Sequence, residues 1–192
     1  MTAPTTVAAE PRATEADTST ADLNGVDGRA VGALVDAVRA TPEAAATTWR
    51  AHVTWEGGFR SAARIRGFAP LASDEPPALG GDDTAPNPVE QVLAALGNCL
   101  AVGYAANAAA AGIAIRDLRV ELAGDLDLRA FLGVRPGHAG FDAIRATVHL
   151  DADADPQVVA RLHEGVVGSS PVGHTLQAAV PLAITLAGGG AA

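Results

Sequence analysis

The fold of this chain is decided by residues 87–112, which read NPVEQVLAALGNCLAVGYAANAAAAG. Asn87 suits a helix N-cap, Pro88 suits the first helical position, and Glu90 closes a capping box with Asn87. A long apolar run follows, and Gly112 ends it. The stretch therefore predicts one long apolar helix that begins at Pro88.

The only cysteine of the chain, Cys99, lies inside this predicted helix. A lone thiol cannot form an intramolecular disulfide, so a redox cycle must take its second thiol from another molecule or subunit. Cys99 shares its helix face with Val92, Leu96 and Gly103, and we expect this face to be buried. A buried free cysteine is usually inert, so two interpretations stay open here: a reactive thiol, or a small core residue.

Glu90 is nine residues from Cys99 on the same helix. At the rise of an α-helix the two residues lie roughly 13 Å apart along the axis and on opposite faces. Glu90 therefore cannot pair with Cys99 of its own chain. Its expected role is the capping box, and only a partner subunit or a bridging cation could couple it to the thiol.

Composition narrows the class of protein. The chain has 192 residues, of which 48% are hydrophobic, enough for one domain with a substantial core. The net charge of -9 argues against nucleic acid as a partner. Polar residues interrupt the long apolar helix, which argues against a membrane span. We expect a disordered tail over residues 1–25, a single domain over 26–192 and, without a signal peptide, a soluble cytoplasmic protein.

The remaining elements are expected from hydrophobic periodicity and turn residues. They are a short helix around residues 31–38, a hairpin of 48–55 and 59–66, an acidic loop over 73–86, strands over 115–129 and 143–151, helices from 156 and 171, and a last strand over 180–186. Helices and strands mix without strict alternation, so the expected fold class is α+β.

Other candidate site residues lie in the acidic loop and near the C-terminus. Asp74 and Glu75 lie in the loop that leads into the Cys99 helix, where loops often line sites. Ser170 suits the N-cap of the helix that starts at Pro171, and His174 is either a surface or interface residue or a base for Cys99. The other histidines are expected to be solvated or satisfied polar residues without a role; these are His52, His138, His149 and His163. No motif or spacing points to a metal or a cofactor.

The order of five motifs resembles the OsmC/Ohr family. They are Asn87–Glu90, Ala94–Leu100, Gly112–Ile113, Gly124–Asp127 and Ser170–Leu176. The resemblance implies an α+β fold with a long central helix packed against antiparallel sheet, and two chains intertwined as a homodimer. It also implies thiol-dependent reduction of organic hydroperoxides, with Cys99 as the peroxidatic cysteine.

The chain departs from the family's pattern at three points. The family's resolving cysteine belongs where this chain has Ser170, and its catalytic glutamate belongs at Val89, with Glu90 one place later. No arginine can be assigned to activate Cys99, although Arg60, Arg64 and Arg66 are candidates.

These departures leave three functional hypotheses. The leading one is a one-cysteine hydroperoxide reductase that needs an external thiol. The second is a catalytically degenerate protein that binds a small apolar or cationic molecule in a cavity at the dimer interface. The third is a thiol redox sensor, for which the sequence offers only the thiol itself.

Overall fold

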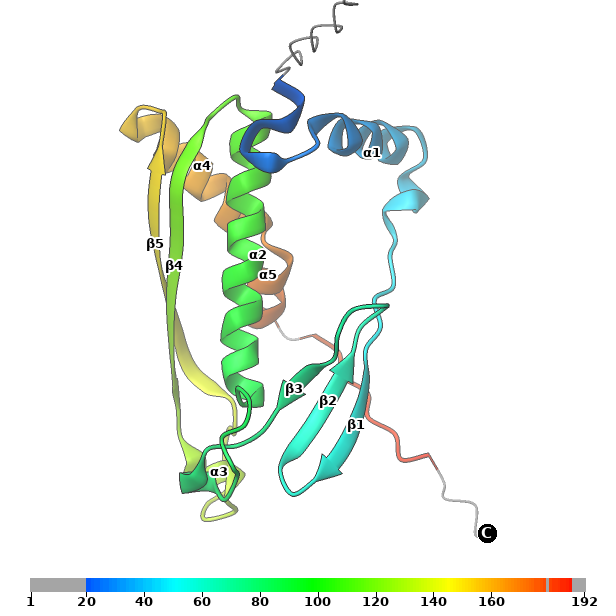
Figure 1. Cartoon of the computed structure of the whole chain (residues 1–192), viewed down its shortest axis with the longest axis vertical. Helices are drawn as coiled ribbons and strands as arrows, with labels where there is room; N and C mark the ends of the chain where they lie inside the picture. Colours follow the sequence, from blue (N-terminus) through cyan, green and yellow to red (C-terminus); the bar gives the residue numbers. More distant parts are fainter. Residues whose placement is uncertain (1–19, 179, 188–192) are drawn as a thin grey trace, which may run out of the picture.

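The computed structural model describes residues 20–178 and 180–187 (Figure 1). Its helices are α1 (Gly28–Ala40), α2 (Pro88–Ala110), α3 (Leu128–Phe131), α4 (Pro156–Ser169) and α5 (Pro171–Gln177), with short 3-10 helices η1 (Thr20–Gly25), η2 (Pro42–Ala45) and η3 (Pro77–Leu79). Its strands are β1 (His52–Gly57), β2 (Arg60–Arg64), β3 (Leu71–Ser73), β4 (Ile115–Leu126) and β5 (Phe141–Ala152). The α+β class expected from the sequence is confirmed.

The core forms where α2 packs against the β4–β5 sheet and against helix α4. Figure 1 shows α2 beside the two strands. Along α2 the buried side chains recur every four residues; they are Leu96, Leu100, Tyr104 and Ala108. Leu162 and Val166 of α4 complete this cluster together with Ile113. Gly103 allows the close approach of α4, because a Cβ there would lie 2.9 Å from Val166 Cγ1.

The alternation predicted for β4 and β5 is also confirmed. The strands pair antiparallel, with Leu118 opposite Leu150 and Val120 opposite Val148. These apolar side chains pack on the core, while the other face carries polar side chains such as His149, whose Nε2 lies 3.4 Å from Glu121 Oε2. The period of two residues places the two sets on opposite faces.

The second sheet stands apart from this core. Strands β1 and β2 form the predicted hairpin, and β3, which the sequence did not predict and whose last residue opens the expected acidic loop, adds a third antiparallel strand. These three strands contact one another far more than they contact any other element of the chain. The sheet exposes large apolar side chains, among them Val53, Trp55 and Leu71.

The predicted tail lies mostly outside the described residues. Its last part, η1, packs against α2. The Asn24 side chain donates to the Ile113 carbonyl and accepts from the Ile115 N–H, both at 2.9 Å. This segment therefore closes the turn between α2 and β4.

The prediction of a strand over residues 180–186 is wrong for the described part of the chain. Residues 180–187 form no ladder with any described strand, and Leu182, Ile184 and Leu186 are exposed. In Figure 1 this red segment runs away from β4 and β5. A strand needs a neighbour for its backbone hydrogen bonds, and the single chain supplies none here. The strand predicted over 115–129 also ends early, because Asp127 caps the short helix α3.

Candidate functional site

The structure brings Cys99 and Ser170 together, although 71 residues separate them. Cys99 Sγ lies 3.3 Å from Ser170 Oγ, at the place where α2 meets the start of α5. Cys99 is half-buried and flanks the fully buried row of α2 rather than belonging to it. The thiol is therefore neither a sealed core residue nor fully exposed.

The hydroxyl of Ser170 has a second contact besides the sulfur. As predicted, Ser170 is the N-cap of α5: its Oγ accepts from the Gly173 N–H at 3.1 Å. Ser170 is only 5% exposed. Among its described contacts, Cys99 Sγ is the atom that can accept the hydroxyl proton of Ser170. Because a hydroxyl has one proton and two lone pairs, Ser170 can accept from Gly173 and also bond the sulfur, and it is the donor when Cys99 is a thiolate, which has no proton to give.

Glu90 forms the capping box predicted from the sequence. Its backbone N–H donates to Asn87 Oδ1 and its carboxylate accepts from the Asn87 N–H, both at 2.9 Å. Glu75 also reaches this end of α2, where its carboxylate accepts from Asn87 Nδ2 at 3.4 Å. The two carboxylates therefore lie at the helix start, well over two turns of α2 from Cys99.

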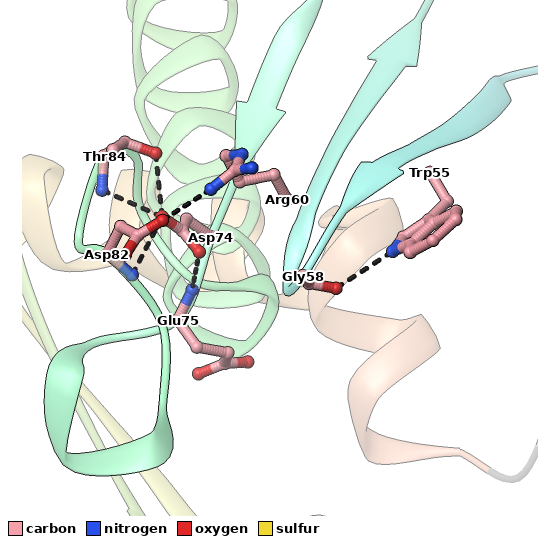
Figure 2. Close-up of polar contacts among 7 residues, drawn as sticks. All are labelled: Trp55, Gly58, Arg60, Asp74, Glu75, Asp82 and Thr84. Carbon is pink, nitrogen blue, oxygen red and sulfur yellow. Dashed lines mark hydrogen bonds and ion pairs between the residues drawn. The ribbon is translucent and has the colours of Figure 1, made fainter.

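Asp74 is a buried anion that organises the acidic loop (Figure 2). Its carboxylate accepts from the Thr84 hydroxyl at 2.8 Å and from the backbone N–H groups of Thr84, Glu75 and Asp82. The Thr84 hydroxyl, aided by these backbone donors, lowers the pKa of Asp74, while burial opposes the shift. The loop expected to line a site thus uses its most buried carboxylate to hold its own backbone.

None of the candidate arginines is among the described contacts of the Cys99 thiol. Arg60 pairs with Asp82 at 2.5 Å (Figure 2). Arg66 lies over the Phe68 ring at 4.7 Å from its centroid. Arg64 ends β2 and is exposed. His174 is exposed as well, and its Nε2 lies 2.9 Å from the Gly168 carbonyl. Within the described residues, Ser170 is thus the one hydrogen-bond partner of the Cys99 thiol.

A cavity of about 650 Å³ lies beside this pair. Strand β5, helix α2 and helices α4 and α5 line it, and Ser170 reaches its wall. Of the residues proposed from the sequence, Ser170 alone belongs to this lining; Glu90, Asp74, Glu75 and His174 do not.

His163 is a satisfied polar residue, as expected, but the sequence did not identify its partner, Tyr104. The Tyr104 hydroxyl is hydrogen-bonded to His163 Nδ1, the ring centroids are 6.2 Å apart, and His163 lines the cavity. A usable signal existed, because Tyr104 is the only tyrosine and falls on the buried face of α2, where its hydroxyl needs a partner. Nothing in the sequence identified which residue that partner is.

Within residues 20–178 and 180–187, no three histidine, cysteine or acidic side chains gather as metal ligands do. In the same part of the chain, α2 is the one helix long and apolar enough to cross a membrane, a property that core helices of soluble proteins share. Its buried row packs on the sheet and on α4.

Fold and site together define an α+β protein with one accessible thiol at the junction of a long central helix and a short capped helix. The family model for OsmC-like proteins matches residues 80–185, and the chain belongs to this family. The match covers the long helix, the β4–β5 sheet, and both Cys99 and Ser170.

Solved structures of the family share the fold at low sequence identity. An OsmC-like protein from Mycoplasma pneumoniae is 17% identical with a TM-score of 0.58, covering 68% of this chain and 88% of that one. An organic hydroperoxide resistance protein OsmC from Legionella pneumophila is 16% identical with a TM-score of 0.54, covering 69% and 92%. The search of curated proteins found no match.

Proposed function

We propose that this chain reduces organic hydroperoxides with Cys99 as the attacking thiol and an external thiol as the reductant. The observation that carries the proposal is the 3.3 Å contact between Cys99 Sγ and Ser170 Oγ. It puts a hydroxyl where the family resemblance expects a resolving cysteine. Structural neighbours described as organic hydroperoxide resistance proteins, from Legionella pneumophila and Elizabethkingia anophelis, support the reaction class.

The reaction balances with two equivalents of external thiol. The Cys99 thiolate attacks the terminal oxygen of the hydroperoxide, the O–O bond breaks, and the alkoxide leaves as an alcohol after taking a proton. Cys99 is left as a sulfenic acid, which a serine hydroxyl cannot reduce. One external thiol displaces water to form a mixed disulfide, and a second releases Cys99 and departs as the external disulfide.

Ser170 has a supporting role in this scheme. A thiolate accepts hydrogen bonds more strongly than a thiol, so donation from Ser170 stabilises the attacking form. The N-cap contact with Gly173 keeps the hydroxyl oriented toward the sulfur. Loss of such a charge-assisted bond costs about 1.5–3 kcal/mol, so Ser170→Ala should slow sulfenic acid formation roughly tenfold or more.

The active form in this proposal is a homodimer. Three surfaces of the described chain support it: the apolar β1–β3 sheet, the α2 face around Val102, and the extended segment 180–187. Val102 is 69% exposed in the middle of the long helix. A three-stranded sheet without a covered face is not expected to be stable by itself, and a second copy of the chain would cover it.

A second candidate is a binding protein that has lost the chemistry. The observation that favours it is that the described Cys99 thiol bonds the Ser170 hydroxyl, while Arg60 pairs with Asp82 instead of the thiol. A thiol without a nearby cation is usually a poor nucleophile at neutral pH. This candidate expects ligand binding that survives Cys99→Ser and no consumption of peroxide.

The two candidates are separated by a single-turnover experiment. The reduced full-length protein is mixed with one equivalent of cumene hydroperoxide, and sulfenic acid is trapped with a dimedone-type reagent and detected by intact mass. We expect rapid trapping that Cys99→Ser abolishes, and turnover only when an external thiol is added. An unmodified protein after excess peroxide would overturn the reductase and leave the binding protein.

A further inference from the structure

Helix α1 is amphipathic, and its apolar face is uncovered in the single chain. Val31, Leu34, Val35 and Val38 recur at the spacing that places them on one face of the helix. In the described part of the chain, none of the α1 side chains is buried, and Leu34 is 63% exposed. A helix of 13 residues is only marginally stable in water without a surface to pack on. We therefore expect another surface to cover this face.

The start of α1 is held at one end of α2. The preceding η1 packs on α2, and the Asn24 side chain bonds the backbone of Ile113 and of Ile115. Asp27 then caps α1 by accepting from two N–H groups of its first turn. From this anchor α1 leads away from α2, and the chain continues into β1 (Figure 1). The helix is thus an arm whose base is fixed to the core.

This arm lies on the side of α2 that the core leaves open. In Figure 1, α1 and the β1–β3 sheet both lie on the side of α2 away from β4 and β5. Val102 is two residues from the buried Leu100, so it points to roughly the opposite side of α2 from the core. The uncovered face of α1 and the exposed face of α2 are therefore close enough in the fold to belong to one interface.

The chain exposes more surface than a compact monomer of its mass. Its accessible area is 14865 Å², whereas a compact protein of 19.2 kDa exposes roughly 8,400 Å². Even if residues 1–19, 179 and 188–192 are counted as fully open chain, roughly 3,600 Å², the rest exceeds the compact value by roughly 2,800 Å². Obligate homodimers bury roughly 2,000–5,000 Å² over both chains. The excess area is therefore what an obligate homodimer needs.

The charges on α1 favour a protein surface over a membrane as its cover. Helices that lie on membranes have a polar face rich in lysine and arginine. The polar side of α1 carries Arg29 and Arg39 together with Asp36, which pairs with Arg39. The net charge of -9 also repels anionic lipid. Residues 1–19 are a poor cover as well, because Met1 and Val7 are their only large apolar side chains.

We propose that α1 is a clasp, which packs its apolar face on the second copy of the chain beside the interface that contains Val102. The clasp rests on the homodimer of the proposed function. It goes beyond that homodimer, because α1 lies outside residues 80–185, the part of the chain that matches the family. In a symmetric dimer each copy contributes one clasp, so the contact is made twice and slows the separation of the two chains.

The first test measures how fast the two chains separate. Full-length protein labelled with heavy nitrogen is mixed with the same protein unlabelled, and native mass spectrometry follows the formation of mixed dimers. Leu34→Gln combined with Val35→Gln removes most of the apolar face while keeping a good helix former at both positions. We expect this double variant to exchange chains at least tenfold faster than the wild type, because each change occurs twice in the dimer.

The matched control is Ala33→Gln. Ala33 is exposed and lies on the opposite face of α1 from Leu34 and Val35, so this variant should exchange chains at the wild-type rate. Leu34 and Val35 are themselves exposed in the single chain, so the double variant leaves the core of each chain intact.

A photo-crosslink identifies the surface that α1 contacts. Leu34 is replaced by p-benzoylphenylalanine, labelled and unlabelled chains are allowed to mix, and the sample is irradiated. The isotope content of the joined peptides tells whether they come from one chain or from two. We expect crosslinks between two chains from Leu34, and far fewer when Ala33 carries the same photoreactive group.

The outcomes separate the clasp from the homodimer. A monomeric wild type would overturn both. A wild-type dimer whose exchange rate is unchanged in the double variant, or crosslinks from Leu34 that stay within one chain, would overturn the clasp and leave the homodimer standing. Neither measurement depends on Cys99, whose sulfenic acid trapping tests the peroxide chemistry by itself.

Discussion

At the scale of single residues, Asp74 makes the stability of the acidic loop depend on pH. Because hydrogen bonds from Thr84 and nearby N–H groups lower its pKa, the ionised form contributes stability above the usual value of 3.8. This contribution is lost as the pH falls through the lowered pKa. We expect Asp74→Asn to lower the urea midpoint at pH 7. The difference between the urea midpoints of the variant and the wild type should narrow as the pH falls toward 2.

The control for this pH series is Asp36→Asn, since Asp36 lies on the exposed α1 with 78% of its side chain accessible. It should follow the wild-type curve throughout. A constant gap between Asp74→Asn and the wild type from pH 7 to 2 would show that the carboxylate charge has no part in holding the loop.

The Cys99–Ser170 contact makes a second prediction at this scale. Ser170→Cys would place a second thiol at a site 3.3 Å from Cys99 Sγ, close enough for a disulfide after a small shift. After one equivalent of peroxide, the variant should lose two hydrogens in intact mass and no longer react with the dimedone-type reagent. Persistent trapping at Cys99 in this variant would mean that the two side chains do not meet in solution.

At the scale of elements, the start of α2 depends on its capping box. Asn87→Ala removes the acceptor of the Glu90 N–H and the contact with Glu75. Loss of such a cap costs about 1 kcal/mol. Chemical denaturation should report this loss, whereas Asn98→Ala, at an exposed position inside the same helix, should cost little or nothing. Equal effects of the two changes would contradict a capping role.

The elements also differ in how readily the sequence reveals them. The capping residues of α2 and the alternation in β4 and β5 are local signals, and the structure confirms them. Strand β3 has three residues and no alternation long enough to detect, so it was missed. The segment 180–186 has the alternation of a strand yet forms none in the single chain, because pairing depends on a neighbour.

At the scale of the whole molecule, the exposed face of α2 predicts association of two chains. Val102→Glu would place a charge in the proposed interface and should lower the mass measured by light scattering from dimer to monomer, or reduce stability. Val134→Glu is the matched control, because Val134 is 70% exposed and lies outside α2. A monomeric wild type, with an unfolding temperature independent of concentration, would contradict the dimer.

The candidate site was predictable from the sequence only in part. Cys99 and Ser170 were both singled out, one as the only thiol and the other as a helix cap, and each property is local. Their contact, the partner of Tyr104 and the internal use of Asp74 were not predictable, because each joins residues distant along the chain.

The sequence by itself determined the elements that rest on short-range physics: the caps, the helical and strand periods, and the family motifs. Only the tertiary structure decided which side chains meet, since packing of α4 against α2 brings Ser170 to Cys99 and His163 to Tyr104. Periodicity tells which face of an element is buried, but not which residue of another element lies against it. That choice depends on packing across the whole domain, and the chemistry proposed at Cys99 depends on it.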